Sequence, residues 1–306
     1  MIISDKLKIY LLNKIKSKIL FDEPMRNHTT IRVGGSCAMF FEPNIIIELL
    51  EIIKFLNEKK IKFYVIGNGS NLLVDDLGFD GAIIKINKNF EKNNIEIKNE
   101  TIICSAGILL PKISKIAYEN NLSGFEFACG IPGTVGGSVC MNAGAYDSEM
   151  KNVVFSCDIF DTNDNEIKIF NNKELNFDYR SSIISEKYII LCAKFKLFFK
   201  NNKEEIKKTM TDFNNKRKNK QPIEFPSAGS IFKRPKGFYV GKLIQDAGLA
   251  GFTIGGAQIS KKHCGFMINI GNATAQNFLD LIELTKKIIS NRFGVKLQTE
   301  IKYLKK

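Results

Sequence analysis

The chain has 306 residues, of which 44% are hydrophobic and 25% charged, and a formal net charge of +13. These proportions are those of a soluble globular protein with roughly two domains. The charge suggests a nucleic-acid partner, but Lys and Asn are spread along the chain and the densest basic run, at 216–220, is short. We therefore predict no nucleic-acid partner, and favour a general attraction for anionic substrates.

Charged residues at positions 5, 6 and 8 precede any long apolar run, so we expect no signal peptide. No stretch reaches the roughly 20 apolar residues that span a bilayer, and we expect no membrane partner. The seven cysteines contain no C-x-x-C spacing and fit buried thiols in a reducing cytoplasm. His28 and His263 lack carboxylate or thiolate neighbours at a metal-binding spacing, so we predict no metal site.

Periodicity predicts the elements in chain order. An amphipathic helix carrying apolar residues from Leu7 to Leu20 comes first, followed by strands around a Gly34–Gly35 turn at 29–43. Next come a helix at 44–59, strands at 62–66 and 82–86, a hairpin region at 92–106 and a helix at 110–121. The segments 153–161, 166–170 and 188–199 have strand-like composition.

A composition shift near 200–205 marks a domain boundary. Beyond it we predict a polar helix at 203–217, a helix starting near Gly241, and a helix capped by Thr274 and stopped by Gly294. The last segment alternates apolar and polar residues from Val295 to Tyr303, which predicts a strand.

Two glycine loops are the strongest functional signal. The segment GNGSNLL (67–73) follows a strand, and GIPGTVGGSVCMNAGA (130–145) contains five glycines among small residues. Glycine permits positive φ and close approach of the backbone to a ligand, and such loops present N–H groups to a diphosphate. The third glycine and the helix of a Rossmann fingerprint are missing after 67–73. The pair indicates a dinucleotide held outside the usual folds; a bare cluster of turns is the alternative.

Eight segments in order resemble one family, the flavin-dependent UDP-N-acetylenolpyruvoylglucosamine reductases, in their shorter type II branch. The matching segments are HTTIRVGG (28–35), GNGSNLL (67–73), GIPGTVGGSVCMNAGAY (130–146), YRSS (179–182), PSAGSIFKRP (226–235), GKLIQDAGLAGFTIGGAQIS (241–260), KHCGFMIN (262–269) and FGVKLQTE (293–300).

The resemblance implies an α+β fold with a two-lobed FAD-binding domain of the vanillyl-alcohol-oxidase (PCMH) type and a C-terminal α+β substrate-binding domain. We place the FAD-binding domain at 1–201, with lobes at about 1–88 and 89–201, and the substrate-binding domain at 202–306. The implied reaction reduces UDP-N-acetylglucosamine enolpyruvate to UDP-N-acetylmuramate, with NADPH as hydride donor, a hydride added at C3 and a proton at C2. No obligate protein partner is implied.

The resemblance also implies the site residues. Arg180 would stabilise charge at the substrate carboxylate, Ser230 would donate the proton to C2, and Glu300 would assist at the carboxylate. Lys220 would bind the UDP diphosphate. Lys233 and Arg234 would supply a positive field and substrate contacts, with Arg234 standing where many members have Asn. FAD would bind noncovalently, and His28 would be structural. The implied FAD-binding residues are Gly67, Asn68, Gly69, Ser70, Asn71, Leu72, Gly130, Ile131, Pro132, Gly133, Thr134, Gly136, Gly137, Ala143 and Gly144.

Two rival functions stay open from the sequence. Another flavin oxidase or dehydrogenase of the same fold, acting on a sugar or alcohol, would share the glycine loops. It has no reason to carry AGSIFKRP, KHCGF and FGVKLQTE together. A nonenzymatic binding protein would instead exploit the positive charge, and its affinity for nucleic acid would fall steeply with salt.

Overall fold

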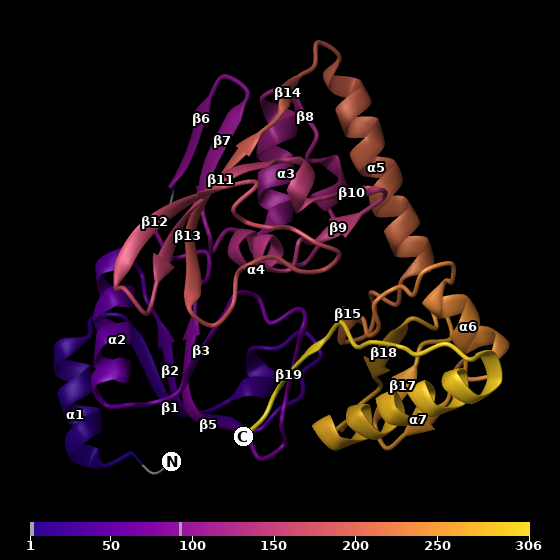
Figure 1. Cartoon of the computed structure of the whole chain (residues 1–306), viewed down its shortest axis with the longest axis horizontal. Helices are drawn as coiled ribbons and strands as arrows, with labels where there is room; N and C mark the ends of the chain where they lie inside the picture. Colours follow the sequence, from indigo (N-terminus) through magenta and orange to yellow (C-terminus); the bar gives the residue numbers. More distant parts are fainter. Residues whose placement is uncertain (1–2, 92–93) are drawn as a thin grey trace. The chain divides into compact units, whose positions relative to one another are not determined.

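The structure is a computed structural model that describes residues 3–91 and 94–306. Helices are interspersed among runs of consecutive strands along the chain (Figure 1). The helices are α1 Asp5–Lys14, α2 Ile46–Glu58, α3 Leu110–Glu119, α4 Val135–Cys140, α5 Lys203–Lys220, α6 Val240–Asp246 and α7 Ala275–Phe293, with 3₁₀ turns η1 Met25–Asn27, η2 Glu126–Ala128 and η3 Met150–Asn152. The strands are β1 Lys18–Pro24, β2 Ser36–Glu42, β3 Phe63–Ile66, β4 Leu72–Val74, β5 Phe79–Lys85, β6 Ile95–Lys98, β7 Thr101–Ser105, β8 Leu122–Ser123, β9 Gly144–Ala145, β10 Ser148–Glu149, β11 Val154–Asp161, β12 Glu166–Asn171, β13 Tyr188–Lys196, β14 Phe198–Phe199, β15 Ser227–Ser230, β16 Thr253–Ile254, β17 Ala257–Ile259, β18 Phe266–Asn269 and β19 Lys302–Leu304.

The chain forms two compact units, each built from separate segments. The first unit takes in the chain up to Phe21, Met39–Asn68 and Gly81–Lys216. The second unit takes in Asp22–Ala38, Gly69–Asp80 and Arg217–Lys306. The first glycine loop therefore changes unit between Asn68 and Gly69.

The first unit contains an antiparallel sheet in the order β12-β11-β13-β7-β6 among its described residues. Helix α4 packs against β13 and β7, and α3 packs against β8. A second sheet has the order β1-β2-β5-β3, in which β3 and β5 are parallel. The described strands of one sheet thus come from residues 18–85 and those of the other from residues 95–196.

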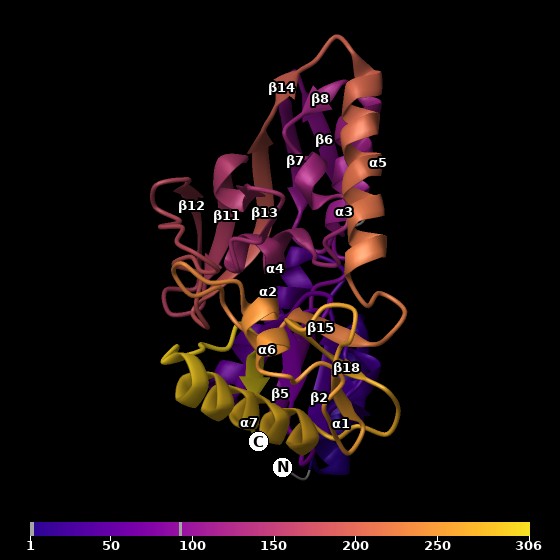
Figure 2. The same cartoon turned by 90° about the vertical axis from the view of Figure 1, so that its right-hand side faces the viewer.

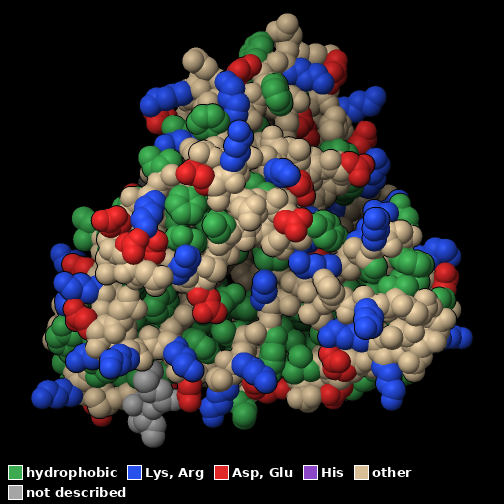
Figure 3. Space-filling model, viewed as in Figure 1, with side chains coloured by type: hydrophobic (Ala, Val, Ile, Leu, Met, Phe, Trp, Pro, Cys, Tyr) green, Lys and Arg blue, Asp and Glu red, His purple; other side chains and the backbone are tan. Residues whose placement is uncertain are grey.

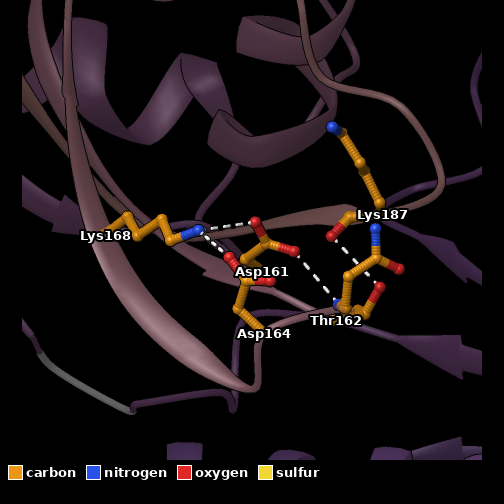
Figure 4. A network of polar contacts seen from close by, with 6 residues as sticks. Asp161, Thr162, Asp164, Lys168 and Lys187 are labelled. Carbon is orange, nitrogen blue, oxygen red and sulfur yellow. Dashed lines mark hydrogen bonds and ion pairs between the residues drawn. The ribbon is translucent and has the colours of Figure 1, made fainter.

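The hairpin that joins β11 to β12 is held by a cluster of charges (Figure 4). Lys168 Nζ lies 2.9 Å from Asp161 Oδ2 and also contacts Asp164. The hydrogen bond from Lys168 lowers the pKa of the Asp161 carboxyl below its ordinary value. Because Asp161 is only 4% exposed, Lys168 neutralises a carboxylate that burial would otherwise destabilise.

The second unit has an antiparallel sheet in the order β15-β18-β17-β16 among its described residues. Helix α7 packs against β16, β17 and α6. Figure 1 shows it beside β17, and in both Figure 1 and Figure 2 it lies below α6. Phe278, Leu281, Ile282 and Ile289 recur at helical spacing and are buried in this unit's core.

Helix α7 is capped at both ends as predicted. Thr274 Oγ1 accepts a hydrogen bond from Asn277 N at 3.1 Å, and Gly294 ends the helix with φ of +67°. Asp76 supplies a second cap, since its two carboxylate oxygens accept hydrogen bonds from Ala275 N and Gln276 N at 2.7 and 2.9 Å. This cap ties the segment after the first glycine loop to the C-terminal helix.

Strand β19 pairs in parallel with β4, in a two-stranded sheet that joins residues 302–304 to 72–74. Tyr303 Oη donates a hydrogen bond to Asp75 Oδ2 at 2.6 Å. That bond is the main cause of a lowered pKa at Asp75. Burial, followed by the same bond, raises the pKa of Tyr303 to about 12.

Tyr303→Phe should lower the free energy of unfolding by about 1 kcal/mol at pH 7, the usual cost of losing one hydrogen bond. Asp75 has a lowered pKa in the folded state, so its stabilisation is present above its ordinary pKa of 3.8 and is lost as pH falls through the folded value. The difference in the free energy of unfolding between wild type and Tyr303→Phe, measured by urea unfolding, should therefore shrink from pH 7 to pH 3. An equal difference at both pH values would contradict this assignment.

Most predicted elements are confirmed, and the structure differs from the sequence expectations or adds to them at four places. The first helix ends at Lys14, because Ile19 and Leu20 pair within β1. Within 29–43, strand β2 covers 36–42 alone. The second glycine loop contains helix α4, with Val135 and Val139 buried. The last strand covers 302–304 rather than 295–303.

The cysteines agree with a simple expectation from composition. All seven cysteines lie in the described part of the chain and are thiols, and five of them are buried. Burial raises the pKa of Cys104 and Cys157, which keeps both thiols protonated. No helix in the part that the structure describes is both long enough and apolar enough to cross a bilayer.

Candidate active site

The two glycine loops contact one another within the first unit. A Cβ added at Gly67 would lie 2.1 Å from Thr134 Oγ1. Any side chain at position 67 would therefore force Thr134 or the loop to shift. Beside it, Asn68 Nδ2 donates a hydrogen bond to Pro132 O at 2.7 Å. The structure thus brings together two segments that the sequence singles out separately.

The second loop owes its glycines to close packing as well as to its turns. Thr134 Oγ1 accepts a hydrogen bond from Gly137 N at 3.4 Å and so caps α4. A Cβ at Gly136 would meet Ala106 Cβ at 3.0 Å, and one at Gly133 would meet Ser138 Oγ at 2.4 Å. These contacts hold the main chain of the loop in one conformation.

The residues present fit a cofactor that carries a diphosphate. Segments 67–73 and 130–145 contain no Asp or Glu, so no carboxylate within them repels an anion. Gly69 has φ of +64°, and a Cβ there would lie 2.1 Å from His28 O. Main-chain N–H groups in glycine loops of this kind are the donors that bind a dinucleotide diphosphate.

Within the second unit, four of the motif segments are joined by hydrogen bonds. Thr30 N donates to Gly69 O at 3.2 Å, and Thr30 Oγ1 donates to Ser227 O at 2.7 Å. Asn71 Nδ2 donates to Glu300 O at 3.1 Å. Segments 28–35, 67–73, 226–235 and 293–300 therefore lie side by side although they are far apart in the sequence.

Ser230 ends β15 at an irregular point of the sheet. Gly229 precedes it with φ of +79°, and the register between β15 and β18 shifts between Ser227 and Ser230. The Ser230 hydroxyl is half-buried and donates to Phe232 O at 3.2 Å. This irregularity aims the side chain differently from those of a regular ladder.

Glu300 lies on the segment next to Ser230. Its N–H donates to Ile231 O at 2.8 Å, and Phe232 pairs with Thr299 in an isolated bridge. Glu300 is half-buried. The structure thus places two of the three predicted catalytic residues on adjacent extended segments.

His263 is a neighbour of this pair that the sequence reasoning missed. Its Nδ1 accepts a hydrogen bond from Gly265 N at 3.1 Å, and burial lowers its pKa. A Cβ at Gly265 would lie 3.0 Å from His263 Cε1 and 3.6 Å from Ser230 Oγ. Because Gly265 has no side chain, the imidazole of His263 and the hydroxyl of Ser230 have space beside it. The KHCGF motif was the signal that could have identified it.

Arg180 lies in the first unit, against the second glycine loop. Its Nη2 donates to Gly144 O at 3.1 Å, and its guanidinium carbon is 5.1 Å from the centre of the Tyr179 ring. Arg180 has φ of +55°, which costs energy at a non-glycine residue. The YRSS segment thus holds its arginine in an uncommon backbone conformation beside the loop.

The predicted substrate-binding cations lie on the second unit or at its edge. Lys220 is exposed at the end of α5, and Lys233 is half-buried. Arg234 is exposed, with its guanidinium carbon 3.9 Å from the centre of the Tyr239 ring and its Nε donating to Phe238 O at 3.3 Å. Elsewhere, Lys and Arg are scattered over the visible surface (Figure 3). His28 Nε2 lies 2.9 Å from Glu23 Oε1, in an ion-pair contact.

Comparisons with known proteins agree with this arrangement. Residues 37–170 match the FAD binding domain, and residues 221–304 match the C-terminal domain of UDP-N-acetylenolpyruvoylglucosamine reductase. The reductase of that name from Caldanaerobacter subterraneus subsp. tengcongensis is 46% identical over 98% of this chain and 97% of its own length. The one from Clostridium beijerinckii is 47% identical over 94% of this chain and 93% of its own length.

A solved structure gives the same result. The UDP-N-acetylenolpyruvylglucosamine reductase of Thermus caldophilus superposes with a TM-score of 0.80 at 31% identity, covering 95% of this chain and 99% of its own. The α+β fold class with an FAD-binding domain is confirmed. The chain belongs to the UDP-N-acetylenolpyruvoylglucosamine reductases and is an FAD-dependent oxidoreductase.

Proposed function

We propose that this protein reduces UDP-N-acetylglucosamine enolpyruvate to UDP-N-acetylmuramate with electrons from NADPH. The observation that carries the proposal is the placement of Ser230 beside Glu300, joined through the main chain at Ile231. A hydroxyl donor next to a carboxyl group suits a reaction that ends in protonation of a carbon beside a carboxylate.

The glycine loops bind FAD noncovalently, chiefly through main-chain groups of 67–72 and of 130–137 with 143–144. The chemistry that FAD supplies when bound is two-electron transfer, from NADPH to C3 of the enolpyruvyl ether. We assign FAD binding to residues 1–201 and substrate binding to 202–306. Segments 22–38 and 69–80 pack with the second unit. The protein acts in the cytoplasm, on small molecules alone.

Three side chains act on the negative charge at the substrate carboxylate and on the proton that is added to C2. Arg180 stabilises the negative charge that develops at the substrate carboxylate, because its planar guanidinium binds two oxygens at once. Ser230 Oγ donates the proton to C2, and the positive charge of Lys233 and Arg234 lowers its effective pKa. Glu300 assists at the substrate carboxylate.

Lys220 and Arg234 bind phosphate groups of the substrate or of NADPH. Arg234→Ala should raise KM about tenfold for a phosphate-bearing ligand and change kcat less than twofold, because the lost contact is made equally in the ground and transition states. Steady-state kinetics with each substrate varied in turn measures this. Arg26→Ala, which removes an exposed arginine of the same unit, is the control. Unchanged KM values for both ligands in Arg234→Ala would exclude a phosphate contact.

An anaerobic titration tests the function as a whole. One equivalent of NADPH should bleach the visible flavin spectrum, and UDP-N-acetylglucosamine enolpyruvate should restore it. Bleaching without restoration, together with rapid reoxidation by oxygen, would favour an oxidase acting on another sugar or alcohol. A protein that stays colourless after incubation with FAD would overturn the proposal.

A further inference from the structure

The side chain of Asn71 contacts the strand of Glu300. Asn71 belongs to the first glycine loop, where the sequence suggests a cofactor contact. Yet its amide Nδ2 donates to the main-chain oxygen of Glu300 at 3.1 Å. Both residues belong to the second unit and both are half-buried. This contact is independent of any ligand.

The main chain of Glu300 is fixed on both sides. Its N–H donates to Ile231 O at 2.8 Å, next to Ser230, and its carbonyl accepts from Asn71. Two hydrogen bonds on successive peptide groups fix the direction in which Cβ leaves the backbone. Removing the bond from Asn71 frees the peptide group between residues 300 and 301. The carboxyl group of Glu300 is then no longer held in one direction.

The contribution of the side chain can be separated from that of the loop. The parallel pairing of β19 with β4 begins with Lys302 N donating to the main-chain oxygen of Asn71 at 3.0 Å. A substitution at position 71 keeps this bond. Asn71 also lacks the positive φ of Gly69, so an apolar side chain with the same number of heavy atoms strains the backbone little.

We propose that Asn71 is a positioning residue, whose side-chain amide holds the carboxyl group of Glu300 in register with Ser230. The first glycine loop then has two functions: its main chain binds the cofactor, and one of its side chains sets the geometry of proton delivery. This inference rests on the proposed role of Glu300.

The test uses Asn71→Leu, which keeps the size of the side chain and removes its donor. We expect flavin reduction by NADPH to stay within twofold of wild type, and reoxidation by UDP-N-acetylglucosamine enolpyruvate to slow about tenfold. Asn172→Leu is the matched control, because Asn172 Nδ2 also donates to main-chain oxygens, at Lys151 and Val154. It should leave both half-reactions unchanged.

A double-mutant cycle with Glu300→Gln distinguishes positioning from general loosening. If Asn71 acts through Glu300, the two substitutions together should slow reoxidation little more than Glu300→Gln alone. In urea unfolding of the FAD-loaded protein, both variants should lower the free energy of unfolding, Asn172→Leu at least as much as Asn71→Leu, because Asn172 loses two asparagine–carbonyl bonds and Asn71 loses one.

The outcomes separate the inference from the function on which it rests. Additive effects on reoxidation, or weaker FAD binding in Asn71→Leu with normal reoxidation of the FAD that stays bound, would overturn the positioning role and leave the proposed function intact. A Glu300→Gln variant that is reoxidised at the wild-type rate would overturn the role of Glu300 itself, and the inference with it.

Discussion

Ser230→Ala should retain flavin reduction by NADPH while reoxidation by UDP-N-acetylglucosamine enolpyruvate slows at least about 10²-fold, the low end for loss of a general acid. The physical reason is that the hydroxyl is needed when C2 takes up its proton and not earlier. Anaerobic stopped-flow absorbance of the flavin measures the two half-reactions separately.

Ser227→Ala is the matched control for Ser230. Ser227 lies on the same strand, and the bond that it makes with Thr30 uses its main-chain oxygen, so removing its hydroxyl keeps that bond. Both half-reactions should proceed at wild-type rates in Ser227→Ala. If Ser230→Ala slows both half-reactions equally, Ser230 positions NADPH or the cofactor and is not the proton donor.

Gly67→Ala should disrupt the contact between the two glycine loops. The added methyl group would lie 2.1 Å from Thr134 Oγ1, so either the Thr134 side chain rotates away or the two loops separate. Overpacking of this kind costs about 1–3 kcal/mol, and displacing Thr134 also weakens the cap of α4. We expect a lower urea midpoint and loss of FAD on gel filtration, read from the ratio of absorbance at 450 and 280 nm.

Thr134→Ala provides the test of the mechanism. Alone it should cost about 1 kcal/mol, as N-cap losses do. Combined with Gly67→Ala it removes the clashing oxygen and leaves the nearest contact at the Thr134 Cβ, 3.2 Å away. The double variant should therefore retain more FAD than Gly67→Ala. A double variant that is worse than both single ones would show that the clash is not the cause.

Local signals predicted those elements whose stability depends on neighbours in sequence. Helix α7 is the clearest case: its buried stripe, its N-cap at Thr274 and its stop at Gly294 are all local features. The hairpin β6–β7 and helix α2 were predicted for the same reason. Each of these elements carries its own pattern of apolar residues.

The expectations that were wrong concern segments whose structure depends on a distant partner. Residues 295–301 alternate as a strand does, but ladder pairing begins at Lys302, where β4 supplies a parallel neighbour. At the other end of the chain, Ile19 and Leu20 fit a helical stripe and instead pair within the sheet that contains β1. Strand pairing across long separations overrides local periodicity in both places.

The candidate site was predictable as a set of residues but not as an arrangement. The family motifs identified Ser230 and Glu300 as candidates. No rule of residue spacing, however, predicts a contact between positions that are 70 residues apart. The hydrogen bonds that bring the segments together come from side chains such as those of Thr30 and Asn71. The local sequence around these residues does not reveal their distant partners. Their partners lie 197 and 229 residues away.

The same separation has a consequence for synthesis of the protein in the cell. A ribosome that adds roughly 5–20 residues per second needs on the order of 10–50 s to pass from Asn71 to Glu300. During that interval the apolar segment Leu72–Val74, buried in the finished protein, has not yet met the strand at 302–304. A nascent chain therefore keeps the segment Leu72–Val74 without its strand partner for most of translation, and unpaired apolar strands are prone to pair with other chains.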